Sequence, residues 1–243
     1  MFHKYKKLWI IILCIISVGL IGFGIYLGDY YPANDQALEA LVSSDKVTVR
    51  EQKDGSIVFE PHEPTVGFIF YPGGKVEHKA YAPLMHRLAE EGVQCILIKM
   101  PFRVAIFDVN AADGIREQYP EIERWYLGGH SLGGTIAASY IAEHEGEYVG
   151  LCLLASYSME DLSAMDLESL SVYGTQDKVL NMENYKRYRT KLPSDTIEQV
   201  IDGGCHAYFG SYGEQDGDGV ATMLPEEQQS IAAEAVIDVM ISE

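Results

Sequence analysis

Short apolar runs alternate with longer segments of helical periodicity along most of the chain. A short run rich in β-branched and aromatic residues, bounded by glycine, proline or polar residues, is typical of a strand buried on both faces. The predicted strands are 47–49, 57–59, 66–71, 94–100, 124–128, 148–155, 170–173 and 196–201. The predicted helices are 81–91, 111–119, 132–145, 181–191 and 226–241.

This order of elements predicts an α/β protein. Strands that alternate with helices form a mostly parallel, doubly wound sheet, with right-handed crossovers placing helices on both faces. The first two strands flank Lys53-Asp54-Gly55, which predicts an antiparallel hairpin. We expect one domain over 47–243, because a chain of 243 residues with 47 % hydrophobic residues can bury a full core. The connection 156–169 is too short for a large cap domain.

The first 28 residues follow a different pattern. Three lysines lie within residues 1–7, and residues 8–28 contain no charged side chain. This run matches the roughly 20 apolar residues that cross a bilayer, whereas the apolar core of a cleavable signal is usually about 7–15 residues long. We therefore expect residues 1–28 to form a basic cytoplasmic tip and a single-pass signal-anchor. A long cleaved signal peptide is the alternative, and both place the acidic domain outside the cytoplasm. Residues 29–46 are predicted to be a linker with a short helix at 36–41.

The charge and the cysteines narrow the classes of partner. The formal net charge of −18 argues against nucleic acid as a partner. Cys95 and Cys152 fall in separate predicted strands, Cys205 precedes a histidine, and Cys14 lies in the apolar segment. Their spacing suggests no disulfide framework, so we expect free thiols that are mostly buried, with a Cys95–Cys152 bond as the alternative.

A glycine-flanked serine lies between a predicted strand and a predicted helix. Gly129-His130-Ser131-Leu132-Gly133 fits the G-x-S-x-G nucleophile elbow, in which a sharp turn exposes the serine hydroxyl at the edge of a sheet. Strand and helix backbones cross closely on either side of this serine, and glycine removes the Cβ atoms that would hold them apart. Ser131 is therefore the candidate nucleophile.

A serine needs a base and an oriented acid to act as a nucleophile. Asp177 follows the predicted strand 170–173, and His206 lies in a glycine-rich loop after 196–201. Both loops open at the carboxyl edge of the sheet, where ligands bind in open α/β sheets. Asp202 is a weaker candidate for the acid and is expected to be a turn residue, and His130 is expected to pack beside the elbow. The remaining histidines in the predicted domain are expected to be solvated: His62, His78, His86 and His144.

With the loop Tyr71-Pro72-Gly73-Gly74-Lys75-Val76, these motifs make the chain resemble the α/β-hydrolase superfamily. The likeness runs roughly from Thr65 to the C-terminus and is greatest to small, cap-less bacterial members. It implies an α/β-hydrolase fold with Ser131 as nucleophile, His206 as general base and then acid, and Asp177 as the residue that fixes the imidazole tautomer.

An oxyanion hole requires two fixed N–H donors. The N–H of Leu132, the residue after the nucleophile, is expected to supply one. Gly74 is the expected second donor and Lys75 the alternative to it, because the loop after strand 66–71 supplies this group in the resembled family. The Lys75 side chain is a candidate contact for an anionic substrate group, although a solvated loop lysine is the simpler interpretation. Asp216-Gly217-Asp218-Gly219 lacks the rest of a calcium-binding pattern, and no metal or cofactor is expected.

The function that these residues predict is a membrane-anchored, extracytoplasmic serine hydrolase that cleaves carboxylic esters through an acyl-enzyme. Its expected substrate is a small or surface-presented acyl ester, because the absent cap implies an open site. An acyltransferase or thioesterase would use the same triad, and a non-catalytic, hydrolase-like surface binding protein is the alternative from another class.

Overall fold

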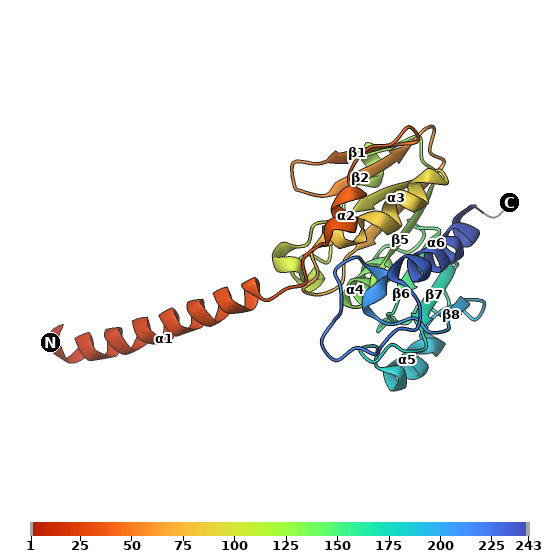
Figure 1. Ribbon diagram of the computed structural model, residues 1–243. Coiled ribbons are helices and arrows are strands. Elements are labelled where there is room, and N and C mark those ends of the chain that lie inside the picture. The colour runs from red at the N-terminus through yellow and green to blue at the C-terminus, as the bar shows by residue number, and fades with distance from the viewer. Residues whose placement is uncertain (1, 242–243) are drawn as a thin grey trace. The chain divides into compact units, whose positions relative to one another are not determined.

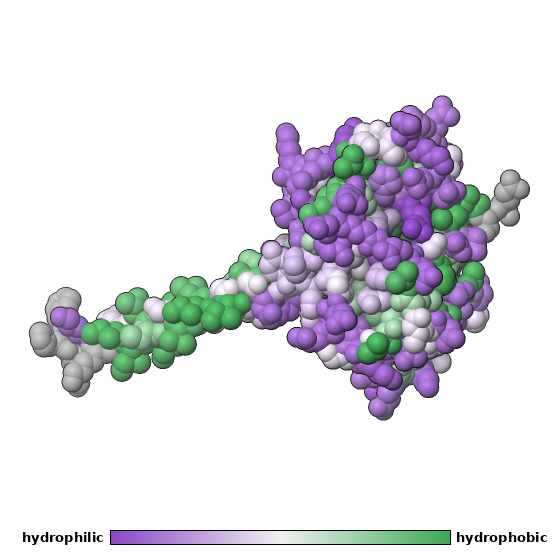
Figure 2. Space-filling view, viewed as in Figure 1, coloured by the Kyte–Doolittle hydropathy of each residue, from purple (hydrophilic) through white to green (hydrophobic). Residues whose placement is uncertain are grey.

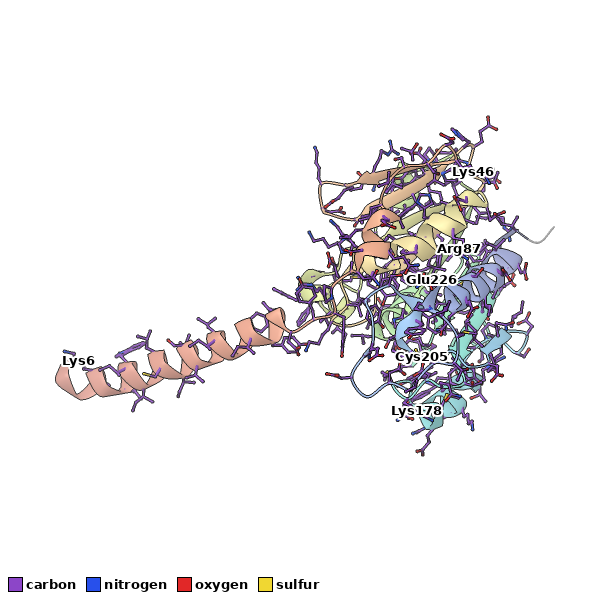
Figure 3. All side chains as sticks on the ribbon, in the orientation of Figure 1. Lys6, Lys46, Arg87, Lys178, Cys205 and Glu226 are labelled. Carbon is purple, nitrogen blue, oxygen red and sulfur yellow. The ribbon has the colours of Figure 1, made fainter. Side chains whose placement is uncertain are left out.

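The computed structural model describes residues 2–241, and the chain divides into one compact unit that ends at Tyr30 and another that begins at Tyr31. The first unit is helix α1 (Phe2–Gly28). Its segment Leu8–Gly28 has a mean hydropathy of 2.8 and is long and apolar enough to cross a membrane, a test that a signal sequence also passes. Apolar residues cover the visible face of this helix (Figure 2), and Lys6 lies near its N-terminal end (Figure 3).

The second unit is built on one eight-stranded sheet with the order β1-β2-β4-β3-β5-β6-β7-β8. Figure 1 labels β1 and β2 at one end of this sheet and β7 and β8 at the other. The β1–β2 and β2–β4 pairs are antiparallel, and all other pairs are parallel. The predicted mostly parallel sheet is therefore confirmed. The strands are β1 (Val47–Glu51), β2 (Ile57–Pro61), β3 (Val66–Tyr71), β4 (Val93–Leu97), β5 (Arg124–His130), β6 (Gly150–Leu154), β7 (Glu168–Gly174) and β8 (Ile197–Ile201).

Helices cover both faces of the sheet. In β3, Phe68 and Phe70 pack into a core with helices α3 (Ala82–Glu90) and α6 (Pro225–Ile241). Ile69 and Tyr71 point to the opposite face, where helix α4 (Leu132–Glu143) packs. This alternation explains why β3 is apolar throughout, since it is buried on both faces, whereas the edge strands β1 and β8 are largely exposed and carry polar side chains. The short helix α5 (Met182–Tyr188) follows β7.

The β6–β7 connection, residues 155–167, contains neither helix nor strand. The short cap-less connection expected at this point of the fold is confirmed.

The helix predicted at 111–119 is wrong. The segment forms turns and the single 3₁₀ turn η4 (Arg116–Gln118). Gly114 has φ +68°, a left-handed conformation that ends any helical run. Asp113 accepts a hydrogen bond from the hydroxyl of Tyr140 at 2.8 Å, so turn-forming residues and a tertiary contact outweigh the apolar periodicity.

Residues 29–46 differ from the predicted linker, because the chain joins the compact unit at Tyr31. The Tyr31 N–H donates to the Lys75 carbonyl at 2.8 Å, and the Asn34 N–H donates to the Ser211 carbonyl at 2.9 Å. Asn34 also caps helix α2 (Asp35–Glu39). Ala37 on this helix is fully buried, so its small apolar side chain attaches the segment to the domain.

Cys95, Cys152 and Cys205 are buried and unpaired, so the free thiols are confirmed and the alternative Cys95–Cys152 bond is not formed.

Three of the histidines expected to be solvated are not: His144 is partly buried and its Nδ1–H donates to the Tyr140 carbonyl at 2.8 Å, while His78 and His86 contact distant segments. His78 is buried and its Nε2–H donates to the Gly55 carbonyl at 3.0 Å. His86 is partly buried and its Nδ1–H donates to the Ala40 carbonyl at 2.9 Å. Local polarity does not reveal these two distant contacts.

Candidate active site

The candidate nucleophile occupies a strained turn between β5 and α4. Ser131 has φ 52° and ψ −123°, a conformation that residues other than glycine adopt rarely and at an energetic cost. Its N–H donates to the Leu154 carbonyl on the neighbouring strand β6 at 2.9 Å. This backbone is the geometry that the nucleophile elbow requires.

The glycines around Ser131 allow three segments to meet. A Cβ atom on Gly133 would clash with the carbonyl oxygens of Tyr71 and Pro72. A Cβ atom on Gly129 would lie 2.5 Å from the same Tyr71 oxygen. The β5–α4 turn therefore packs directly on the backbone that leaves β3, which brings the Pro72-Gly73-Gly74 loop next to the serine.

Ser156 supports the elbow from the end of β6. Its hydroxyl donates to the Ser131 carbonyl at 2.7 Å and lies 3.2 Å from the Thr135 hydroxyl oxygen. Ser156 is buried, whereas Ser131 and Thr135 are partly buried beside it. The sequence does not indicate this role, because a serine that follows a predicted strand carries no signal of a partner elsewhere in the chain.

The candidate acid and base form a buried hydrogen-bonded pair. The Nδ1–H of His206 donates to Asp177 Oδ2 at 2.8 Å. Asp177 Oδ1 accepts from the N–H groups of Val179 at 2.9 Å and Leu180 at 2.7 Å, which orients the carboxylate. Because Nδ1 carries the proton that faces the carboxylate, Nε2 is left as the basic nitrogen of the ring.

Ser131, His206 and Leu132 line a single pocket of about 260 Å³. In the part of the chain that the structure describes, the Ser131 hydroxyl is not hydrogen-bonded to His206, and catalytic hydrogen bonds often form only when a substrate is in place. Four apolar and four polar residues complete the lining: Ala155, Met159, Val179, Leu180, Thr135, Ser156, Tyr157 and Asn181.

Gly74 and Leu132, whose N–H groups are the candidate oxyanion donors, are neighbours. A Cβ atom on Gly74 would be 3.1 Å from Leu132 Cδ2, so the two residues are in contact. The N–H of Lys75 donates to the Arg103 carbonyl at 2.8 Å, and the N–H of Gly73 donates to the Tyr81 hydroxyl at 3.0 Å. Both of these N–H groups are engaged, which leaves Gly74 as the donor available in this loop. Lys75 is not among the described residues that line the Ser131 pocket.

His130 packs beside the elbow. Its Nδ1 accepts from the Tyr81 hydroxyl at 2.8 Å, and its ring centroid lies 4.5 Å from that of His206. Burial, followed by the neighbouring His206, lowers the pKa of His130 well below its usual value. A neutral His130 adds no positive charge beside the candidate base. No motif in the sequence around Tyr81 predicts its hydrogen bond to His130.

The loop that holds His206 is tied to its surroundings by other residues. Asp202 accepts from the Thr175 hydroxyl at 3.2 Å, as expected of a turn residue. The Gln228 side chain on α6 bonds to both the N–H and the carbonyl of Cys205, at 2.9 and 2.7 Å. Burial raises the pKa of the Cys205 thiol to about 12, so this neighbour of His206 is not a nucleophile at neutral pH. Among residues 2–241, no group of three or more metal-ligating side chains is placed to hold an ion.

A strained serine after β5 at the carboxyl edge of a mostly parallel sheet, with an aspartate after β7 paired to a histidine after β8, is typical of one class of α/β enzyme fold. The model of the alpha/beta hydrolase family matches residues 67–230. The chain therefore belongs to the α/β hydrolase family. This membership supports hydrolysis as the class of reaction.

Solved structures share the fold at low sequence identity. TT1662 from Thermus thermophilus aligns with a TM-score of 0.60 and 14 % identity over 82 % of this chain and 100 % of its own. A predicted CIB-like hydrolase from Thermoplasma acidophilum aligns with a TM-score of 0.54 and 14 % identity, over 78 % and 98 % of the two chains. Est1E from Butyrivibrio proteoclasticus aligns with a TM-score of 0.54 and 14 % identity, over 80 % of this chain and 99 % of its own. No curated protein sequence matches the chain.

Proposed function

We propose that this chain is a membrane-anchored serine hydrolase that cleaves carboxylic esters through an acyl-enzyme. The observation that carries the proposal is the 2.8 Å hydrogen bond between Asp177 and His206, with His206 and the strained Ser131 on one pocket. Family membership supports hydrolysis as the class of reaction.

In the proposed acylation step, His206 Nε2 takes the proton of the Ser131 hydroxyl while Oγ attacks the ester carbonyl carbon. The buried Asp177 carboxylate stabilises the imidazolium that forms. The N–H groups of Leu132 and Gly74 stabilise the developing oxyanion, each contributing roughly 2.7–4 kcal/mol if they behave like other oxyanion donors. His206 then protonates the leaving alcohol, and a water molecule activated by the same nitrogen releases the acid.

The pocket supports a short acyl group as the substrate. Its volume of about 260 Å³ is below the usual range for pockets that hold drug-sized ligands, roughly 300–1,000 Å³. Leu132, Met159 and Leu180 give it apolar walls, and the short β6–β7 connection leaves it without a cap. These features favour small esters or acyl groups presented on a surface.

The proposed location is the cell membrane, with α1 as a single-pass signal-anchor and the domain outside the cytoplasm. Support comes from the apolar segment Leu8–Gly28 and from the lysines that precede it, since basic residues concentrate on the cytoplasmic side of a membrane helix.

Labelling of the full-length protein in detergent with a fluorophosphonate tests the enzyme proposal. We expect the wild type to be labelled and to hydrolyse p-nitrophenyl esters, with a preference for short chains. Ser131→Ala and His206→Ala should lose labelling and at least about 10,000-fold of kcat, as triad deletions do elsewhere. Asp202→Asn is the matched control, because this exposed carboxylate accepts from the Thr175 hydroxyl in the loop after β7 and an asparagine amide oxygen can accept the same bond. A folded wild type that is not labelled would favour the non-catalytic binding protein.

The alternative reactions with the same residues differ in the acceptor or the leaving group. An acyltransferase would form a transfer product when an alcohol is added to the ester assay, and a thioesterase would prefer acyl thioesters to oxygen esters of the same chain length. Hydrolysis of oxygen esters without a transfer product supports the proposed function.

A further inference from the structure

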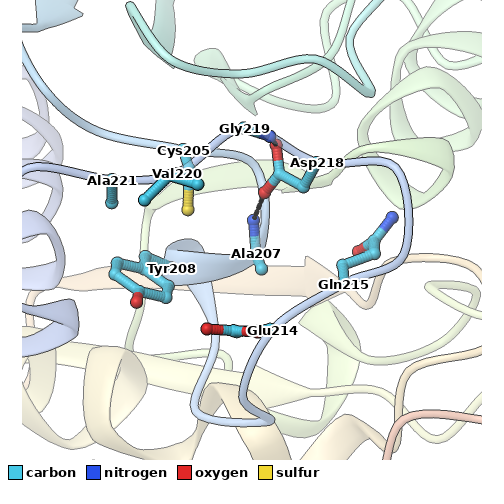
Figure 4. A pocket seen from close by; sticks show the side chains of 9 residues that line it. All are labelled: Cys205, Ala207, Tyr208, Glu214, Gln215, Asp218, Gly219, Val220 and Ala221. Atoms are coloured by element: carbon cyan, nitrogen blue, oxygen red, sulfur yellow. Dashed lines mark hydrogen bonds between the residues drawn. The ribbon is translucent and has the colours of Figure 1, made fainter.

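A loop between η6 (Ala207–Phe209) and α6 places one carboxylate against the two segments that carry the candidate acid and base. Asp218 Oδ1 accepts from the Lys178 N–H at 3.2 Å, and Oδ2 accepts from the Ala207 N–H at 2.9 Å. Figure 4 shows the second of these bonds on the wall of a small cavity. Asp218 Oδ1 also accepts from the Gly219 N–H at 2.7 Å, which orients the carboxylate.

The two main-chain donors belong to the residues that directly follow the candidate acid and base. Lys178 directly follows Asp177, and Ala207 directly follows His206. Asp218 therefore bridges the loop after β7 and the loop after β8 at the residues next to the hydrogen-bonded pair. Hydrogen bonds to an ionised carboxylate are about twice as strong as those between neutral groups, so this bridge is a substantial restraint on both loops.

The Asp218 loop is fitted closely to the loop that precedes Asp177. A Cβ atom on Gly219 would clash with the main-chain carbonyl of Gln176, so only glycine allows the two backbones to approach this closely. The Gln176 N–H in turn donates to the Gly204 carbonyl at 2.8 Å in the His206 loop. The three loops form one assembly, and Asp218 supplies its only carboxylate that contacts both neighbours of the pair among the described residues.

We propose that Asp218 is a positioning residue that holds Asp177 and His206 in hydrogen-bonding alignment. The inference rests on the proposed function, since it assigns a role within that catalytic machinery. Asp218 touches neither Ser131 nor the pocket that Ser131 lines, and it acts through the backbones of Lys178 and Ala207. A displacement of about 1 Å in a catalytic group can lower a rate about 100-fold, so a restraint of this kind affects turnover more than substrate binding.

Asp216 offers a matched control in the same loop. It lies two residues before Asp218, it is exposed, and its main-chain N–H donates to the Tyr31 hydroxyl at 3.2 Å. Within residues 2–241 its carboxylate makes no hydrogen bond to the candidate site. Asp216→Asn therefore removes the same charge from the same loop without removing the bridge.

The test compares Asp218→Ala, Asp218→Asn and Asp216→Asn in the full-length protein in detergent, with a short p-nitrophenyl ester. We expect Asp218→Ala to lower kcat about 10-fold to 100-fold while KM stays within about twofold. Asp218→Asn should fall between this variant and the wild type, because its amide oxygen can still accept one N–H. Asp216→Asn should match the wild type. In proton NMR, the downfield resonance of the His206 Nδ1–H should weaken in Asp218→Ala and persist in Asp216→Asn.

The outcomes separate this inference from the proposed function. A wild type that neither hydrolyses esters nor reacts with fluorophosphonate defeats the proposed function. An active wild type with a folded Asp218→Asn or Asp218→Ala of unchanged kcat, or with a change in KM alone, overturns the role of Asp218. If neither variant folds, amide hydrogen exchange of the wild type decides: protected Lys178 and Ala207 N–H groups support the bridge, and rapid exchange at both overturns it.

Discussion

Two buried side chains, Tyr81 and His130, connect the loop of Gly74 to the candidate base His206, although neither takes part in the proposed reaction. The Gly73 N–H donates to the Tyr81 hydroxyl, which itself donates to His130 Nδ1. The His130 ring in turn packs against His206, with ring centroids 4.5 Å apart. A single hydroxyl thus links the loop of Gly74 with the strand end that carries Ser131.

Tyr81→Phe tests this link at the scale of one atom. Removal of the hydroxyl leaves the buried Gly73 N–H and His130 Nδ1 without partners, which costs about 1–3 kcal/mol for each unsatisfied group. We expect lower stability in urea unfolding and a lower kcat, because the Gly73–Gly74 peptide loses the contact that orients it. Tyr208→Phe, a partly exposed tyrosine near Cys205, is the control and should change neither quantity. Equal kcat in Tyr81→Phe and wild type would contradict the link.

His78 makes the domain sensitive to acid. Burial lowers the pKa of His78 to about 4 in the folded protein, from 6.5. The unfolded chain therefore binds a proton that the folded protein does not, and stability falls as the pH drops from about 6.5 towards about 4. At about pH 5 the loss from this group is about 2 kcal/mol.

Urea unfolding at about pH 7.5 and pH 5 measures this loss. His78→Gln keeps a donor for the Gly55 carbonyl but does not titrate. The wild type should lose about 2 kcal/mol more than the variant between the two pH values. His130 contributes equally to both proteins, so the difference isolates His78. The same pH dependence in wild type and variant would show that His78 is not responsible.

At the scale of elements, the packing of α4 on the end of β3 determines which glycines tolerate a side chain. We expect Gly133→Ala to destabilise the fold by about 3 kcal/mol, because the added methyl group meets the carbonyls of Tyr71 and Pro72, which are backbone and cannot move aside. This cost exceeds the gain of about 1 kcal/mol in helix propensity. Gly74→Ala meets only the end of the Leu132 side chain, and should cost less than about 1 kcal/mol.

Thermal or urea unfolding of the two glycine variants distinguishes the contacts. If Gly133→Ala were as stable as Gly74→Ala, the close approach of the elbow to the β3 end would be wrong. The kcat of Gly74→Ala is a second measurement. It should stay close to that of the wild type, since the main-chain N–H remains in place and the proposed oxyanion contact is kept.

Elements were predictable from the sequence where burial imposes a simple pattern. The strands on both sides of Ser131 are apolar throughout because helices cover both faces of the sheet. The predicted helix at 111–119 failed because turn residues and the contact of Asp113 with Tyr140 outweigh local periodicity. The linker at 29–46 failed because its attachment depends on Ala37 and on main-chain bonds to Lys75 and Ser211, which are distant in sequence.

The same distinction applies to the candidate site. Ser131, Asp177 and His206 could be selected because each follows a strand, and parallel strands bring those positions to one edge. The structure adds the contact of Asp177 with His206 and the shared pocket with Ser131, while their catalytic roles stay a proposal. Partners that support them, such as Ser156, have no local signal because their contacts bridge separate segments.

The whole molecule combines an acidic domain with an apolar helix that carries lysines at its start. Residues 29–243 contain 15 Lys and Arg against 36 Asp and Glu, a formal charge of −21 that repels this part of the chain from anionic lipid surfaces, so the proposed membrane binding rests on apolar contacts of the helix. The unit from Tyr31 onward contains Ser131, Asp177 and His206 and is compact by itself. The proposed membrane attachment and the proposed chemistry therefore depend on different units of the chain.

Removal of residues 1–30 should separate the two properties. We expect residues 31–243 to be soluble, folded and labelled by fluorophosphonate as well as the full chain, because the truncation removes no residue of the candidate site. The full chain should stay with membranes in alkaline carbonate and leave them only in detergent. The double variant Ile15→Asp, Val18→Asp should weaken this retention, since each carboxylate near the helix centre costs about 2.5–3.5 kcal/mol on insertion scales.

The proposed orientation has its own test. Digestion of intact cells with an external protease should remove the domain. A domain protected until the cells are lysed would contradict the proposed orientation, and release of a shortened, labelled chain into the medium would identify a cleaved signal in place of an anchor.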